Sequence, residues 1–168
     1  MGRPCDGYNG NVLRYMSITP NAYANMLGSP EYPEIRGIVR FTQLETGVFV
    51  EAEITGLPET DTDFFGFHLH WGTCSSEGAG PTDYFPNTEG HYNPTDQPHP
   101  RHAGDFPPLL ATGSGSAYLA FVTDRFSVQD ALGRAVVIHL ERDDFTTQPA
   151  GDTGRKIACG IVSPNIRL

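Results

Sequence analysis

The sequence predicts an all-β protein, a sandwich or barrel of about seven antiparallel strands. Three observations support this class: short runs of alternating apolar and polar residues recur along the chain, 19 glycines and 14 prolines are spread throughout it, and apolar stripes at helical spacing are rare. Short alternating runs separated by turn residues are typical of β-sandwiches and barrels. A length of 168 residues with 38% hydrophobic residues suits one core. We therefore expect a single domain over residues 1–168, with residues 1–20 as a loosely ordered extension.

The strands follow from the alternation. In residues 48–55 the valines, Ala52 and Ile54 share one face, and the intervening residues, among them Glu51 and Glu53, share the other. Residues 35–43 form a matching run, and the segment 44–47 ends in a glycine suited to a turn with positive φ, so the two runs predict a hairpin. The other expected strands cover residues 22–27, 64–70, 117–123, 134–140 and 156–162.

Residues 71–110 predict a long loop, because they are rich in Gly, Pro, Asn, Asp and Thr. Structureless segments of this length inside a compact domain are usually functional. A metal ion would supply the cross-links that such a loop lacks in apolar contacts.

Charge and hydropathy exclude several classes. The chain has 20 acidic and 11 basic residues and a net charge of −9, which argues against a nucleic-acid partner. No stretch approaches the roughly 20 apolar residues of a membrane span, so we expect no membrane partner. The opening residues lack the apolar core of a signal peptide. The sequence as written predicts a cytoplasmic protein, or a periplasmic or secreted one if a leader has been removed.

The six histidines lie where they could gather. His68 and His70, two residues apart on an expected strand, project from one face, and His139 stands on another expected strand. The remaining candidates fall in the long loop: His91, His99, His102 and Asp105. A single histidine is more often a surface residue or a hydrogen-bonded core residue, but the set favours metal binding. Tetrahedral His and Asp donors suit Zn²⁺, whereas four flattened imidazoles suit Cu²⁺.

Five motifs then occur in one order: Gly-Phe-His-Leu-His, Gly-His-Tyr-Asn-Pro, His-Ala-Gly-Asp, Val-Ile-His and Ala-Cys-Gly. On these motifs the chain, from about residue 35 to residue 162, resembles the copper/zinc superoxide dismutases, of a bacterial type. The resemblance implies an immunoglobulin-like Greek-key β-barrel or sandwich with long metal-binding loops. It also implies an oxidoreductase that converts superoxide to dioxygen and hydrogen peroxide, with copper and zinc as cofactors. Both monomers and homodimers are compatible with it.

The resemblance carries over residue by residue. It implies two ligand sets that share His91, a copper set and a zinc set: His68, His70, His91 and His139 for copper, and His91, His99, His102 and Asp105 for zinc. During turnover His91 would also act as a proton donor. Asp143 would accept hydrogen bonds from His68 and His99 and so orient both rings. Three cysteines allow at most one bridge, and the resemblance implies that Cys74 and Cys159 form it.

The sequence also departs from the family. Lys156, three residues before Cys159, stands where the family has an arginine that guides the superoxide anion; it retains the charge without the planar fork. Arg155 is the alternative, although strand alternation would put it on the opposite face. The electrostatic loop, residues 144–155, is short and lacks lysine, and residues 75–89 lengthen the approach to His91. These departures keep a structural metal domain open as an alternative. Two others are a non-catalytic metal carrier or store, against which the chain has no CxC-type transfer site, and a zinc hydrolase, which a zinc set of four protein ligands disfavours.

Overall fold

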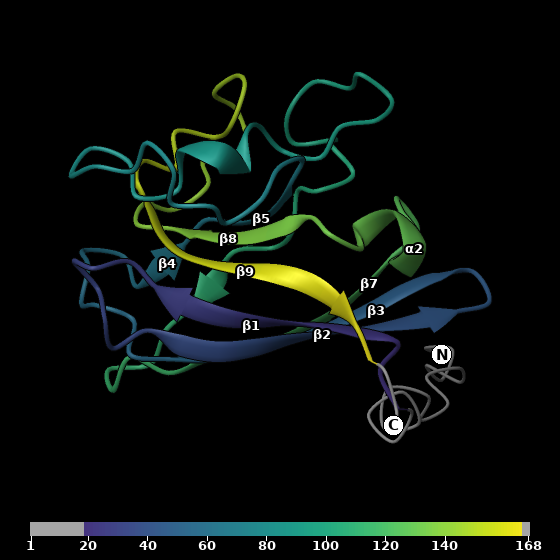
Figure 1. Ribbon diagram of the computed structural model, residues 1–168, viewed down its shortest axis with the longest axis horizontal. Coiled ribbons are helices and arrows are strands. Elements are labelled where there is room, and N and C mark those ends of the chain that lie inside the picture. The colour runs from purple at the N-terminus through teal and green to yellow at the C-terminus, as the bar shows by residue number, and fades with distance from the viewer. Residues whose placement is uncertain (1–18, 166–168) are drawn as a thin grey trace, which may run out of the picture.

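The computed structural model describes residues 19–165 and confirms the all-β class (Figure 1). Nine strands account for most of the regular structure: β1 (Ala22–Gly28), β2 (Arg36–Leu44), β3 (Gly47–Thr55), β4 (Phe64–Phe65), β5 (Phe67–His70), β6 (Leu109–Leu110), β7 (Ala117–Thr123), β8 (Ala135–His139) and β9 (Lys156–Pro164). Within residues 19–165 there are also two short helices, η1 (Pro86–Thr88) and α2 (Val128–Ala131). Most of the expected extension over residues 1–20, including Cys5, lies outside the described residues.

Seven strands form one antiparallel sheet in the order β5-β8-β9-β1-β2-β3-β7. The sheet curls around its core, so that β5, β8 and β9 face β1, β2 and β3 (Figure 1). After β3 the chain passes to β5 at the far edge and then returns to β7 beside β3, a non-local order typical of Greek-key folds. Buried aromatic and aliphatic side chains fill the interior, among them Phe41, Phe65, Phe67, Ile54 and Leu109.

The predicted hairpin is present. Leu44 pairs with Gly47, which leaves Glu45 and Thr46 as a two-residue loop between β2 and β3. Gly47 has a φ of 152°, and a Cβ added there would lie 2.4 Å from the carbonyl oxygen of Thr123 on β7. Glycine is therefore required at this position by both its conformation and the close approach of β7.

The strand expected over residues 64–70 is divided at Gly66. β4 pairs with β6 in a separate two-stranded sheet, whereas β5 pairs with β8 in the main sheet. The Gly66 amide donates to the carbonyl of Glu141 instead of to a strand, and a Cβ at Gly66 would lie 2.7 Å from the Thr153 side chain. The division keeps Phe65 and Phe67 in the core and directs the next part of the chain along β8.

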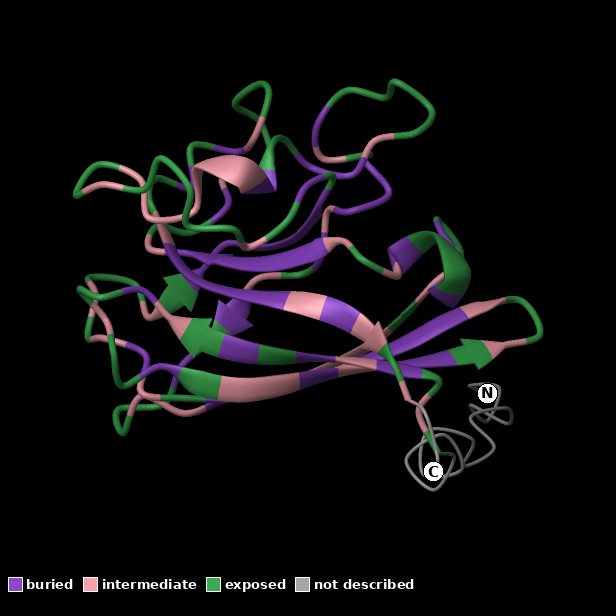
Figure 2. Cartoon of the chain, in the orientation of Figure 1, coloured by how far each residue is buried: buried purple, intermediate pink, exposed green. Residues whose placement is uncertain are grey.

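Helix α2 lies in a segment for which the sequence predicted no helix. Its signal is a capping box, in which the Ser127 side chain accepts from the Asp130 amide and the Asp130 side chain accepts from the Ser127 amide. Within residues 19–165, neither helix is long and apolar enough to cross a membrane. The long loops lie on the outer side of β5 and β8, with exposed tips and buried inner segments (Figure 2).

Candidate metal centre

Two neighbouring strands supply three of the histidines. On β5, Leu69 points into the core, so His68 and His70 project from the outer face. On β8, Ile138 lies in the core and His139 takes the same outer face. Because β5 pairs with β8, the rings of His70 and His139 stack with centroids 5.3 Å apart.

The long loop adds the fourth histidine by pairing with β5. The Trp71 amide donates to the Gly90 carbonyl at 3.0 Å and the Tyr92 amide donates to the Leu69 carbonyl at 2.8 Å. These two bonds hold His91 beside the strand, with its ring stacked on that of His68 at 3.9 Å. Ring nitrogens of four residues then lie within 4.8 Å of one another; we call His68, His70, His91 and His139 the four-histidine group.

A second group shares His91. Asp105 Oδ1 lies 2.7 Å from His91 Nδ1 and 3.2 Å from His102 Nδ1, and Asp105 Oδ2 lies 3.2 Å from His99 Nδ1. Gly104 permits this arrangement, because a Cβ there would lie 2.1 Å from the carbonyl oxygen of Leu69 on β5. We call His91, His99, His102 and Asp105 the histidine–aspartate group.

Asp143 lies behind both groups. Its Oδ2 accepts from His68 Nε2 at 2.8 Å, and its Oδ1 accepts from His99 Nε2 at 2.9 Å and from the Phe145 amide at 2.7 Å. The side chain is only 1% exposed. The adjacent Asp144 instead accepts from the amides of its own turn, Thr146 and Thr147. The structure therefore gives the two neighbouring carboxylates different surroundings.

The hydrogen bonds leave ring nitrogens free in both groups. A carboxylate only accepts, so Nε2 of His68 and of His99 carries the proton and each Nδ1 keeps a lone pair. These two Nδ1 atoms and His91 Nε2 are buried without a hydrogen-bond partner among the described residues. Buried polar atoms are normally satisfied, so three of them converging here indicate sites built to bind cations.

His70 and His139 show the same feature. His70 Nδ1 donates to the Glu89 carbonyl at 2.9 Å, and His139 Nδ1 donates to the Gly154 carbonyl at 3.4 Å. Their Nε2 atoms therefore both carry lone pairs, and these atoms face each other at 3.2 Å. Two facing lone pairs repel each other, whereas a cation between them would be attracted to both. The donors of both groups thus fit bound metal ions such as copper and zinc.

Burial favours the neutral form, which binds metals, in four of the imidazoles: those of His68, His70, His102 and His139. Desolvation, followed by the neighbouring imidazoles, holds the pKa of His68, His70 and His139 well below the usual 6.5. Desolvation also lowers the pKa of His102. Burial of Asp105 favours its neutral acid, but the hydrogen bond and charge interaction with His91, together with the contacts to His102, outweigh burial and lower the pKa of this carboxyl.

The predicted Cys74–Cys159 disulfide is present, with its Cα atoms 5.8 Å apart. It ties the long loop to β9. Three residues before Cys159, Lys156 lines a cavity of about 340 Å³ together with His70, His91 and His139. Arg155 points elsewhere, because its guanidinium pairs with Glu31 at 2.6 Å.

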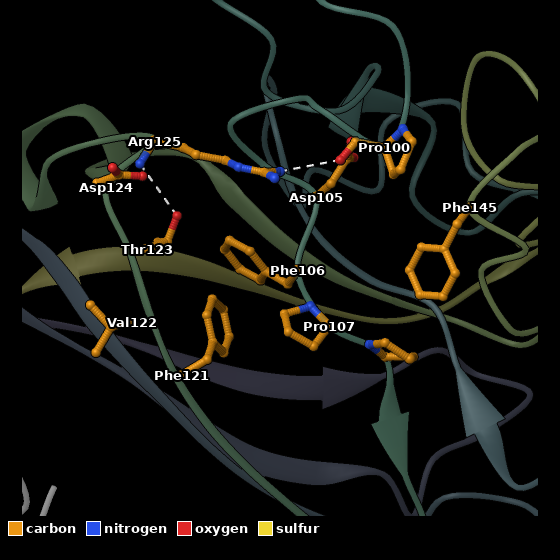
Figure 3. A pocket seen from close by; sticks show the side chains of 11 residues that line it. Pro100, Asp105, Phe106, Pro107, Phe121, Val122, Thr123, Asp124, Arg125 and Phe145 are labelled. Atoms are coloured by element: carbon orange, nitrogen blue, oxygen red, sulfur yellow. Dashed lines mark hydrogen bonds between the residues drawn. The ribbon is translucent and has the colours of Figure 1, made fainter. Parts of the chain in front are cut away.

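Arg125 is a residue that the sequence analysis missed. It follows β7, and its Nη1 donates to the carbonyls of Pro100 at 3.2 Å and His102 at 3.1 Å, which clamps the loop that carries His99 and His102. Figure 3 shows the bond from Arg125 to the Pro100 carbonyl, beside a cavity of about 580 Å³ that Phe106 and Phe121 also line. No motif in the sequence signals the contact, since it joins segments more than twenty residues apart.

The comparisons with known proteins agree with the geometry. A family model described as copper/zinc superoxide dismutase (SODC) matches residues 35–162. A superoxide dismutase [Cu-Zn] of Legionella pneumophila is 34% identical over 155 residues, 88% of this chain and 90% of the relative, and one of Deinococcus radiodurans is 32% identical over 76% of this chain and 77% of the relative. A crystal structure of the clock protein EA4 matches with a TM-score of 0.70 and 29% identity over 88% of this chain and 96% of that one.

These matches confirm the predicted superoxide dismutase activity, with copper and zinc as cofactors, and do not favour a metal carrier or store. The two candidate groups that share His91, the curled antiparallel sheet and the matched residues lead to one assignment: the chain belongs to the copper/zinc superoxide dismutase family.

Proposed function

We propose that the four-histidine group holds the copper ion, that the histidine–aspartate group holds the zinc ion, and that His91 is shared by both. The observation that carries this assignment is the set of three buried, unpartnered ring nitrogens, His68 Nδ1, His91 Nε2 and His99 Nδ1. His68 belongs to the four-histidine group, His99 to the histidine–aspartate group and His91 to both. Four imidazoles are a donor set that Cu²⁺ prefers, and three imidazoles with one carboxylate suit Zn²⁺.

When bound, copper supplies the one-electron redox chemistry of superoxide dismutation. The chain orients the donors: Asp143 fixes the rings of His68 and His99, one in each group. His91 is held at Nδ1 by Asp105, which leaves Nε2 directed into the four-histidine group. We assign to His91 Nε2 the uptake of one proton and its delivery to the forming peroxide, since two superoxide anions and two protons give dioxygen and hydrogen peroxide.

Lys156 is the residue that we propose guides the anion. Among the described residues that line its cavity, it is the one cationic side chain, and the carboxylates of Glu89 and Asp152 line the same cavity. Arg155 is less suited, because it does not line this cavity and its guanidinium is turned towards Glu31. A cation beside the site is needed because the chain as a whole is negatively charged and so repels superoxide.

Ligand replacement tests the metal assignment. We expect His139→Ala to lose copper and keep zinc, and His102→Ala to lose zinc and keep copper, because each residue belongs to only one group. The measurement is elemental analysis after reconstitution, together with superoxide turnover by pulse radiolysis. Copper retained at full stoichiometry and activity in the His139 variant would overturn the assignment.

Lysine replacement tests the guiding role. We expect Lys156→Ala to slow superoxide turnover about two- to tenfold without emptying the copper site, because one steering charge is lost. Lys156→Arg should match or exceed the native rate, because a guanidinium donates two hydrogen bonds to an anion. The deficit of the alanine variant should shrink as salt is raised, since the screening length is only about 8 Å at physiological ionic strength. A native rate with native salt dependence would exclude Lys156.

A further inference from the structure

The ammonium group of Lys156 is already paired. Its Nζ lies 2.8 Å from Asp83 Oδ2 and donates a second bond of 2.8 Å to the Phe85 carbonyl. The lysine side chain is 17% exposed and that of Asp83 is 38% exposed. The cation that faces the copper-side cavity is therefore accompanied by an anion from the segment 75–89.

Asp83 is held in place independently of the lysine. Its Oδ1 accepts from the Phe85 amide at 2.9 Å, and its backbone exchanges two bonds of 3.0 Å with Gly80. Asn87 braces the same segment by donating to the carbonyls of Ser75 and Glu77 at 3.2 and 2.7 Å. The Asp83 carboxylate is thus held in a fixed position by its own segment, and the Lys156 ammonium group extends to it.

We propose that Asp83 sets the rate of anion capture by neutralising Lys156, an inference that rests on the proposed guiding role of Lys156. A lone cation attracts an anion over a distance limited by salt, whereas a close pair of opposite charges presents a dipole whose field falls off faster. With Glu89 and Asp152 also lining the cavity, the pair leaves no uncompensated cation among the described lining residues. Asp83 would then lower the rate at which superoxide reaches the site.

Four proteins test this: the native chain, Asp83→Asn, Lys156→Met and the double variant. Superoxide kcat/KM is measured by pulse radiolysis over a range of ionic strength, with copper and zinc content determined for each. We expect the kcat/KM of Asp83→Asn to be about twofold higher than that of the native chain at low salt, since one elementary charge about 10 Å from an anion in water changes its local concentration by about this factor. The kcat/KM of this variant should also fall more steeply as salt is raised. Lys156→Met should be slower, and the double variant should recover towards the native rate, because both charges of the pair are then absent.

Glu77→Gln is the matched control, because it removes the same charge from an exposed position in the same segment. An equal gain in this variant would overturn the inference, since net charge and not the pair would then control the rate. An Asp83→Asn rate at or below the native one, with Lys156→Met slow, would also overturn it and would make Asp83 a positioning residue. A native rate in Lys156→Met would instead refute the guiding role of Lys156 on which the inference rests.

Discussion

Replacing Asp143 by asparagine should weaken copper binding more than zinc binding. Oδ1 of Asp143 accepts from two donors, His99 Nε2 and the Phe145 amide, whereas Oδ2 accepts only from His68 Nε2. An asparagine has one carbonyl oxygen. If it takes the place of Oδ1 and accepts from His99 Nε2 and the Phe145 amide, the NH₂ group faces His68 Nε2–H. Two donors cannot bond, so the His68 proton must move to Nδ1, the nitrogen that is directed into the four-histidine group.

The expected loss of copper affinity follows from the displacement of this one proton on His68. Loss of an orienting partner typically costs 10- to 100-fold in metal affinity, or about 1.4 to 2.7 kcal/mol. We therefore expect Asp143→Asn to raise the copper dissociation constant by about this factor and to change that of zinc much less. Competition titrations against chelators, run separately for Cu²⁺ and Zn²⁺, measure both. Asp144→Asn is the matched control, because this neighbouring carboxylate bonds only its own turn. Equal losses of both metals, or none, would refute the tautomer argument.

Three further predictions concern stability and the zinc side. Replacing Cys74 and Cys159 by alanine should lower the unfolding free energy of the metal-free protein by about 4 to 5 kcal/mol in urea titrations, because the bridge spans 85 residues; Cys5→Ala should not. Arg125→Met should weaken zinc binding about tenfold and leave copper unchanged in the same chelator assay, because two hydrogen bonds to the zinc-side loop are lost. The folded pKa values of the buried histidines lie below their unfolded value near 6.5, so the unfolded chain binds more protons below that pH. The metal-free protein should therefore lose stability as the pH falls from about 7 to 5, and a stability independent of pH would contradict the neutral state of these rings.

Local patterns in the sequence predicted much of the fold. The bounds expected for residues 117–123 match β7, and those for residues 48–55 differ from β3 by one residue at the start. These strands follow from alternation because each has one buried face. The division at Gly66 could not be predicted this way, since it depends on Thr153 and Glu141, which are distant in sequence.

The ligand candidates were also predictable from residue types and motif order, because metals demand particular donor atoms at recurring spacings. The motifs further singled out Asp143 over Asp144, two residues that composition cannot separate. The resemblance already implied that Asp143 orients His68 and His99. What the motifs could not supply was the orientation of His70 and His139, which the hydrogen bonds to the Glu89 and Gly154 carbonyls decide.

The sequence by itself thus determined the strand pattern, the donor set and the pairing of cysteines implied by the family motifs. Only the tertiary structure decided which charges meet. It separated Lys156 from Arg155 by pairing the first with Asp83 and the second with Glu31. The physical reason is distance along the chain, because these pairs join residues 73 and 124 positions apart. Local sequence patterns carry no information about contacts between residues so far apart, which only folding brings together.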